Sequence, residues 1–267
     1  MARADPPPRV ARTVQLELGT GIGWANTHHV SVRGFDVAED LVGEVSYTEM
    51  ALLTITGRRP TEGEVRVVDA VLVSLVDHGL QPSALVTRLT YHVAPEAIQA
   101  AVAAGLLGAG SLLLGSMEQC GRLLTDVRTD VAAGAAPRAA VRARLQTLLD
   151  QGRRVPGVGH GLHREGDPRA TKLLAVAERE GIARPEVEHL QLVAEEAATL
   201  TQRSLPLNTT GATAALLLGV GIPWNLHRGF ALISRCAGLI AHVGEESETP
   251  MTPAVRQALR DASWLDE

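Results

Sequence analysis

The feature that most constrains the fold is an uncharged stretch at residues 97–117. A stretch of this length can cross a bilayer, so its apolar side chains require burial in lipid or in a protein core. Glycines at positions 105, 108, 110 and 115 interrupt it. Such glycines are unusual in one straight membrane span and suit helices in close contact. We therefore predict a pair of core helices here, with a membrane anchor as the disfavoured alternative.

The composition favours a protein built from helices. Aromatic residues make up 3% of the 267 residues, whereas apolar residues make up 45%. Small aliphatic side chains must therefore fill the core, and alanine and leucine favour helices. A chain of this length can form one large domain or two unequal ones.

Helix boundaries are marked in the first third of the chain. Ser46 and Glu49 have the spacing of a capping box, and Gly57 is suited to end that helix. Pro60-Thr61-Glu62 starts a second helix, which is predicted to run to His78-Gly79. One face of this second helix is predicted to be apolar. Its members are Val65, Val68, Ala70, Leu72, Val73 and Val76.

The sequence disfavours several functional classes. A net charge of -5, without a stripe of aromatic and basic residues, predicts no nucleic-acid partner. Cys120 and Cys236 lack metal-ligand spacing and are predicted to be reduced thiols of a cytosolic protein. His28-His29 has no further metal ligand at suitable spacing, so no metal site is predicted. The start of the chain lacks the apolar segment of a secretory signal, which also favours a cytoplasmic location.

The stretch from Val155 to Arg169 places glycines, histidines and arginines just before a helix. Its glycines let the backbone turn sharply and approach a ligand closely, and its arginines offer fork-shaped donors to a carboxylate or phosphate. These residues are Gly157, Gly159 and Gly161, with Arg164 and Arg169. Asp167-Pro168 is a good helix start, so Arg169 would lie in the first turn. We interpret the stretch as an anion-binding site; a surface connection with solvated charges is the alternative.

Short sequence motifs occur in a fixed order through most of the chain. They are Arg33-Gly-Phe-Asp36, Thr56-Gly-Arg-Arg-Pro-Thr61, Asp77-His78-Gly79, Pro156-Gly-Val-Gly-His160 with Asp167-Pro-Arg169, Asn208-Thr-Thr-Gly211, Gly221-Ile-Pro223, and Ser234-Arg235 leading to Ala241-His242. In order and spacing they resemble the citrate synthase family, in the short form of citryl-CoA lyases and of the citrate synthase module of ATP-citrate lyase.

The resemblance implies an all-α, citrate synthase-like fold and a homodimer. Residues 1–113 and 212–267 would form a large helical domain. Residues 114–211 would form a smaller domain that closes over the substrate. The ligands implied are coenzyme A, as an acyl-CoA substrate, and a dicarboxylate or tricarboxylate.

The resemblance also implies roles for individual residues. His160 would polarise the ketone and His78 would make a second contact to the polar acid. Arg169 and Arg235 would clamp carboxylates, and Asn208 would also contact the substrate. Arg164 would face the coenzyme A phosphates. The loop residues Pro156, Gly157 and Gly159 would curl around its adenine. Arginines and a neutral donor suit a keto acid in a site shielded from water.

Two positions depart from the family pattern. Thr210 stands where the family has an aspartate base, and Leu113 stands where citrate synthases have a histidine that binds the enolate. Loss of a general base costs about 10² to 10⁴ in rate, and loss of an oxyanion donor costs about 10² to 10³. Both residues can also be explained by packing alone, with Thr210 capping a helix that begins at Gly211. An arginine that the family often supplies across the dimer is missing near Thr249-Pro-Met251, with Arg256 as the candidate substitute.

Three hypotheses follow for the function. The first is an enzyme that makes or breaks a carbon–carbon bond between an acyl-CoA and a keto acid. The second is a catalytically impaired relative that binds a di- or tricarboxylate or pairs with an active paralogue. The third is a diverged enzyme that uses another acyl-CoA or another acceptor.

Overall fold

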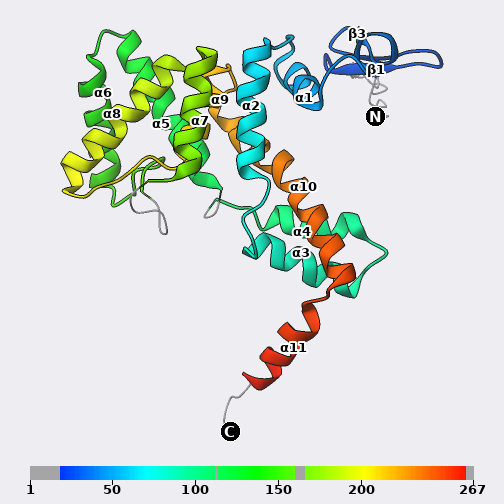
Figure 1. The fold of residues 1–267 in the computed structure, drawn as a ribbon. Coiled ribbons are helices and arrows are strands. Elements are labelled where there is room, and N and C mark those ends of the chain that lie inside the picture. Colours follow the sequence, from blue (N-terminus) through cyan, green and yellow to red (C-terminus); the bar gives the residue numbers. More distant parts are fainter. Residues whose placement is uncertain (1–18, 112–113, 160–165, 263–267) are drawn as a thin grey trace, which may run out of the picture. The chain divides into compact units, whose positions relative to one another are not determined.

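The computed structural model describes residues 19–111, 114–159 and 166–262. It consists of two compact units, Met1–Arg59 and Pro60–Glu267. Figure 1 shows the helices and strands of both units along the chain. Strands within the described ranges occur only in the first unit, where they are two or three residues long. The all-α prediction is confirmed.

The first unit combines a small antiparallel sheet with one α-helix. Its elements are β1 (Gly23–Ala25), β2 (Val30–Val32), β3 (Phe35–Asp36), a π-helical turn η1 (Val37–Leu41) and α1 (Tyr47–Thr56). Ser46 accepts a hydrogen bond from the Glu49 amide at the start of α1, and Gly57 ends the helix in a left-handed conformation, as predicted. The Arg33 guanidinium donates to the Thr54 carbonyl at 2.9 and 2.8 Å and so ties the sheet to α1.

The second unit is helical throughout its described residues. Its elements are α2 (Glu62–Leu75), α3 (Pro82–Val93), α4 (Ile98–Leu107), α5 (Gly115–Ala132), α6 (Pro137–Asp150), α7 (Pro168–Glu180), α8 (Arg184–Thr201), α9 (Thr209–Gly219), the 3₁₀ turn η2 (Trp224–Leu226), α10 (His227–Glu248) and α11 (Thr252–Asp261). Thr61 and Glu64 form the capping box of α2. Among the described residues, no helix is long and apolar enough to cross a membrane.

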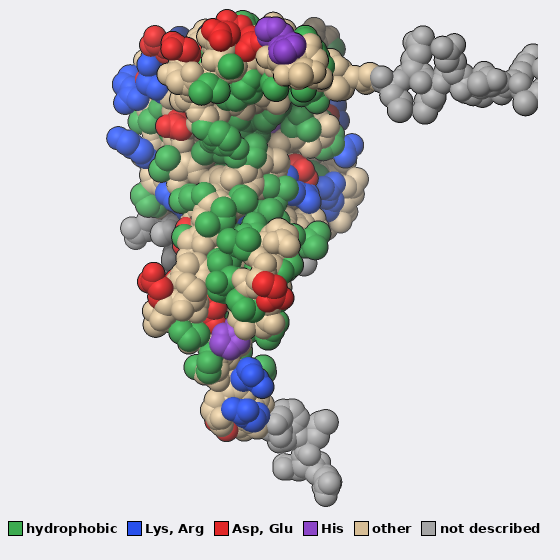
Figure 2. Space-filling model, turned by 90° about the vertical axis from the view of Figure 1, so that its right-hand side faces the viewer, with side chains coloured by type: hydrophobic (Ala, Val, Ile, Leu, Met, Phe, Trp, Pro, Cys, Tyr) green, Lys and Arg blue, Asp and Glu red, His purple; other side chains and the backbone are tan. Residues whose placement is uncertain are grey.

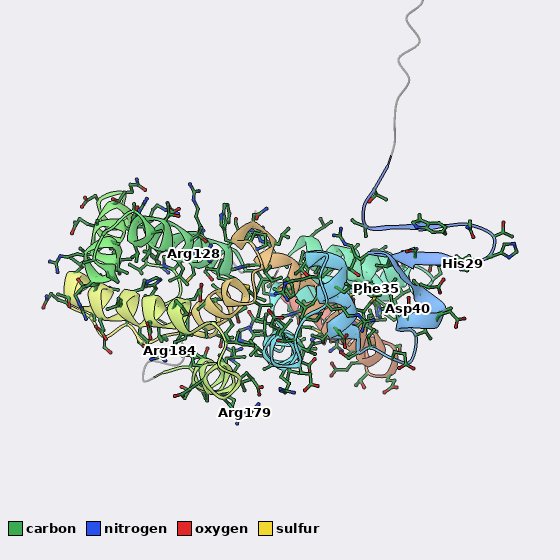
Figure 3. All side chains as sticks on the ribbon, turned by 90° about the horizontal axis from the view of Figure 1, so that it is seen from above. His29, Phe35, Asp40, Arg128, Arg179 and Arg184 are labelled. Carbon is green, nitrogen blue, oxygen red and sulfur yellow. The ribbon has the colours of Figure 1, made fainter. Side chains whose placement is uncertain are left out.

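Helix α9 is the centre of the second unit. Its residues are buried on every side, which is typical of a helix with apolar residues all round. Helices α2, α5, α7 and α8 pack against it. Figure 3 looks down on this packing, with Arg128 on α5, Arg184 at the start of α8 and Arg179 near the end of α7. Burial of α9 fixes its first turn, and that turn carries Asn208, Thr209 and Thr210.

The uncharged stretch forms parts of two helices rather than one. Helix α4 ends at Leu107 and α5 begins at Gly115, and α4 packs against α3 and α10. Gly105 allows the closest approach, because a Cβ there would lie 2.0 Å from the Thr87 hydroxyl. The stretch therefore contains one complete helix, α4, and only the first turn of α5, which corrects the prediction of a buried core pair; Ile98 is 46% exposed and Leu107 is 86% exposed.

A buried ionic network joins α3 to the end of α10. Arg88 of α3 donates from Nε to the Glu246 carboxylate at 2.8 Å. Glu246 also accepts from the amides of Met251 and Thr252 at 3.0 and 3.1 Å, which fixes the turn into α11. Exposed Glu245 binds a second nitrogen of Arg88 at 2.8 Å. The network links segments more than 150 residues apart.

A close backbone contact holds the glycine-rich loop against α9. Gly157 has a positive φ of 85°, which favours glycine. A Cβ on Gly211 would lie 2.3 Å from the Gly157 carbonyl oxygen. We expect Gly211→Ala to lower the free energy of unfolding by about 1–3 kcal/mol, because the loop must move away from α9.

Urea unfolding of Gly211→Ala beside Gly229→Ala checks this expectation. Gly229 lies inside α10, and a Cβ there meets no atom within 4 Å. Its substitution with alanine is expected to be neutral or to stabilise the protein by up to about 1 kcal/mol. Equal effects of the two substitutions would contradict the close contact.

Candidate active site

A cavity of about 200 Å³ brings the predicted site residues together within the second unit. The residues that line it lie in five helices or directly beside their ends. The lining residues are Ser74, Leu75 and His78 from the end of α2, Leu114 and Ser116 at the start of α5, Asp167 and Arg169 at the start of α7, Asn208, Thr209 and Thr210 at the start of α9, and Arg235 on α10. His78, Arg169, Asn208, Thr210 and Arg235 were all predicted from the sequence to belong to one site.

Three helices begin at the wall of this cavity. Leu114, Asp167 and Asn208 are the residues that immediately precede α5, α7 and α9. The N-terminus of a helix carries partial positive charge on its free amide groups, and this favours a nearby anion. Three such ends around one cavity, with two arginines, favour a ligand that carries carboxylates.

Arg235 is a buried arginine without a carboxylate bound to it in the described structure. Its residue is 7% exposed, and Nη2 donates to the Leu75 carbonyl at 3.1 Å. Its Nε has no hydrogen-bond partner among the described residues. Burial lowers the pKa of the guanidinium, and the Asp77 carboxylate opposes this change. A buried cation is costly unless an anion pairs with it, so Arg235 is suited to bind an anionic ligand in the cavity.

Asp167 connects α7 to α9 and positions Arg169. Its carboxylate accepts hydrogen bonds from the Thr209 amide and hydroxyl. It also accepts from Nε and Nη2 of Arg169, both at 3.1 Å. Burial opposes ionisation of Asp167, but these hydrogen bonds hold its pKa well below the ordinary value. Asp167 is therefore ionised at neutral pH and holds Arg169, as the predicted first-turn residue of α7, at the wall.

Thr210 presents a hydroxyl group where the family resemblance led us to expect a base. Its Oγ1 donates to Asn208 Oδ1 at 2.7 Å. Because the hydroxyl proton is engaged in this hydrogen bond, the Thr210 oxygen can only accept a hydrogen bond from a ligand in the cavity. Asn208, rather than Thr210, caps the helix: its Oδ1 accepts from the Gly211 amide at 3.0 Å, and α9 begins at Thr209. The predicted helix start at Gly211 is thus two residues late.

His78 lies where α2 ends and contacts two adjoining spaces. It lines the main cavity and a smaller one of about 120 Å³, which Leu114 and Arg235 also line. Beside it, Asp77 Oδ1 lies 3.0 Å from His242 Nε2. Burial opposes ionisation of Asp77, but the Gly79 amide and His242 keep the pKa of its carboxyl below the ordinary value.

The glycine-rich loop is described only in part. His160, Arg164 and Leu113 lie outside the described residues, so their predicted roles stay predictions. The Gly159 amide donates to the Pro206 carbonyl at 2.7 Å, and Asn208 Nδ2 donates to the Gly159 carbonyl at 2.8 Å. Gly157 packs against α9, whereas Pro156 lines a separate groove. The described part of the loop is therefore held beside the first turn of α9.

Sequence reasoning missed several cavity residues. Ser74 stands one helical turn before His78, and Thr209 adjoins Thr210, so spacing alone could have indicated both. Ser116 follows the glycine that opens α5, and no sequence signal marked it. Among the described residues no group of three or more potential ligands could hold a metal ion; the prediction of no metal site remains untested.

Comparison with known proteins identifies the family. The family model for the C-terminal domain of citrate synthase matches residues 22–256. The chain belongs to the citrate synthase family. The solved structure of citryl-CoA lyase from Hydrogenobacter thermophilus is 32% identical, with a TM-score of 0.83. The match covers 94% of this chain and 95% of that one.

Curated citrate synthases also match the chain. The citrate synthase of Haloferax volcanii is 33% identical over 201 residues, which is 74% of this chain and 50% of the relative. Citrate synthase 2 of Bacillus subtilis is 26% identical over 201 residues, which is 74% of this chain and 51% of the relative. The chain thus spans about half the length of the curated relatives that it matches.

Proposed function

We propose that this citrate synthase family member makes or cleaves a carbon–carbon bond between an acyl-CoA and a keto acid. The observation that carries the proposal is a cavity of about 200 Å³ that buried Arg235 lines together with half-buried Arg169 and exposed His78. Bidentate arginines match the carboxylates of a keto acid such as oxaloacetate. A histidine beside them can polarise a ketone or hold a hydroxyl.

Coenzyme A is the proposed acyl carrier. The citryl-CoA lyase that matches nearly the whole chain supports this assignment. The loop that holds Pro156, Gly157 and Gly159, together with Arg164, would bind the nucleotide end. The described part of this loop is hydrogen-bonded to Asn208, which lines the cavity. A thioester held by the loop would thus reach the cavity of about 200 Å³, which we call the keto-acid cavity.

Residues from both proposed domains line the cavity. Ser74, His78 and Arg235 come from the proposed large domain, whereas Asp167, Arg169 and Thr210 come from residues 114–211. Movement of the smaller domain would therefore open or close the cavity. Closure would exclude water and strengthen the contacts to the carboxylates.

We also propose a homodimer in the cytoplasm. Large apolar side chains remain exposed on α3, α4 and α10, a feature typical of protein–protein contacts. They are Val86, Val93, Ile98, Leu107 and Ile240, which are 39–86% exposed. In Figure 2, hydrophobic side chains are visible in the lower part of the view, at the height where Figure 1 places α3, α4 and α10. A second copy of the chain would cover such a surface.

Thr210 lowers the rate that we expect for the proposed reaction in both directions. Condensation requires a base that removes a proton from the acyl group. Thr210 donates its proton to Asn208 and is a poor base, and Asp167 is held ionised by Arg169 and Thr209. Cleavage requires the reverse transfer, a proton delivered to the departing enolate, so the same group, or a water molecule in its place, must serve both directions. The competing candidate is a protein that binds carboxylates without turnover.

Coupled assays in both directions test the proposed reaction. Oxaloacetate released from citryl-CoA is measured in one direction, and free coenzyme A released from acetyl-CoA plus oxaloacetate is measured in the other. We expect turnover in at least one direction. Tight dicarboxylate binding without turnover of any short acyl-CoA would contradict the proposed enzyme activity. It would support the alternative that the protein only binds carboxylates.

Restoring a carboxylate at position 210 tests the role of the threonine. We expect Thr210→Asp to raise the condensation rate by about 10² to 10⁴, since it places a general base at the cavity wall. Thr210→Asn is the matched control because it has similar size and polarity without a basic oxygen. Steady-state rates of both variants decide the point. Equal rates for the aspartate and asparagine variants would show that position 210 does not supply the base.

A further inference from the structure

A second cavity of about 280 Å³ lies in a groove between α5 and α6. It is lined from α5 by Arg122, from the segment after α6 by Arg153 and Pro156, and from η2 by Trp224. It shares no lining residue with the keto-acid cavity. The groove is therefore separate from that cavity, and Pro156 is its one lining residue that belongs to the loop assigned to coenzyme A.

Two arginines of this groove have no carboxylate partner among the described residues. Its two acidic residues each have an arginine nearby: Glu118 pairs with Arg228, and Asp126 lies 3.9 Å from Arg144, which binds Asp130 more closely at 2.6 Å. Arg122 and Arg153 form no ion pair with any described residue, although both line the groove. A ligand that approaches the groove therefore meets two arginines whose charge no carboxylate of the described structure neutralises. This favours an anionic group on the ligand.

The groove also has a planar wall. The Cζ atom of Arg122 lies 5.7 Å from the centroid of the Trp224 ring, over its face. This cation–π contact holds the guanidinium in place and pairs two flat groups. Flat groups of this kind favour stacking by an aromatic ring. The side chains of Gln119 and Thr147 line the same space and add hydrogen-bonding groups.

We propose that the groove is a second binding site for an aromatic ring that carries a phosphate, the chemistry of a nucleoside monophosphate. The ring stacks on the wall formed by Arg122 and Trp224, and the phosphate binds Arg122 and Arg153. The volume of about 280 Å³ is close to the lower end of the range for ligand pockets, about 300 Å³. It suits a mononucleotide better than a larger ligand.

Calorimetric titration of the full chain with AMP tests the site without any turnover. We expect one AMP per chain. Ribose 5-phosphate, which lacks the ring, and adenosine, which lacks the phosphate, should each bind at least about 10-fold more weakly, because stacking and phosphate contacts both contribute. Absence of AMP binding at millimolar concentration would overturn the proposal.

Variants locate the bound AMP. Arg122→Gln, Arg153→Gln and Trp224→Leu are each expected to weaken AMP binding about 10-fold. Arg154→Gln is the matched control, since Arg154 adjoins Arg153 but does not line the groove, and it should leave the affinity unchanged. Thermal unfolding confirms that Trp224→Leu is folded. AMP binding that none of the three variants weakens lies elsewhere and overturns the proposal.

Competition with coenzyme A separates two sources of the same chemistry, because coenzyme A also carries an adenine and phosphates. A separate site predicts that saturating coenzyme A leaves AMP bound, and that Arg122→Gln leaves coenzyme A affinity unchanged. Displacement of AMP by coenzyme A, with a weakening of coenzyme A binding in the same variants, would make the groove part of the coenzyme A site and would overturn a second site.

Discussion

Arg235→Gln is expected to weaken binding of oxaloacetate or citrate by about 100-fold, because it removes a buried cation that a carboxylate would pair with. Without ligand, the variant should be as stable as the parent or more stable. Nε of Arg235 has no partner in the described structure, and the residue is 7% exposed. An unpaired buried charge lowers the stability of the folded protein, so its removal should not lower that stability further.

Calorimetry and thermal unfolding, applied to the same variant, separate a binding role from a structural one. A structural arginine would lower the melting temperature when replaced and leave ligand affinity unchanged. Arg228→Gln is the matched control, since Arg228 lies on the same helix but pairs with Glu118 and does not line the cavity. Its carboxylate affinity should stay within about threefold of the parent, because it makes no contact that the ligand needs.

Glu246→Ala is expected to lower the free energy of unfolding by about 3–5 kcal/mol, the typical cost of breaking one side of a buried ion pair. The Glu246 side chain is fully buried and that of Arg88 is 5% exposed. The substitution removes the partner of Arg88 Nε, although Glu245 and the Thr249 carbonyl still bind Arg88. It also removes the acceptor for two amides where α11 begins. Glu245→Ala provides the control, since Glu245 also binds Arg88 but is 59% exposed. We expect a loss of about 0–1 kcal/mol there.

Urea unfolding as a function of pH gives an independent check on Glu246. Burial opposes its ionisation, but hydrogen bonds from Met251, Arg88 and Thr252 outweigh burial and lower the pKa from 4.5 to about 2. A lowered pKa contributes stability above pH 4.5 that is lost as the pH falls towards 2. The difference between the parent and Glu246→Gln should therefore shrink over this range. A difference that stays constant with pH would contradict the ionised network.

Local signals predicted several helix starts well, whereas α2 ends at Leu75, before the predicted end at His78-Gly79. Ser46, Thr61 and Asp167 cap helices where the sequence indicated. Such caps depend on contacts within four residues, so the sequence alone can show them. The apolar face of α2 was predicted less well: Val73 is 70% exposed, whereas Val67 and Val71 are buried. Valines occupy several sides of this helix, and periodicity could not select the face that packs.

Motif order predicted the members of the cavity, whereas contacts over long distances in the sequence could not be predicted. His78 from the segment after α2, Arg169 from α7 and Arg235 from α10 line one space. The carboxylate of Asp167 binds Thr209, which is 42 residues away, and no local pattern marks that pair. Likewise, Arg88 and Glu246 are 158 residues apart. These pairs form only when α3, α7, α9 and α10 have packed.

The most direct measurement is a crystal structure of the full chain with citrate and coenzyme A. We predict citrate carboxylates within hydrogen-bond distance of the guanidinium groups of Arg169 and Arg235, inside the cavity of about 200 Å³, with the citrate hydroxyl beside His78. The thiol end of coenzyme A should point into the same cavity near Thr210. Citrate bound elsewhere, with water alone between Arg169 and Arg235, would contradict the proposed site and the reaction assigned to it.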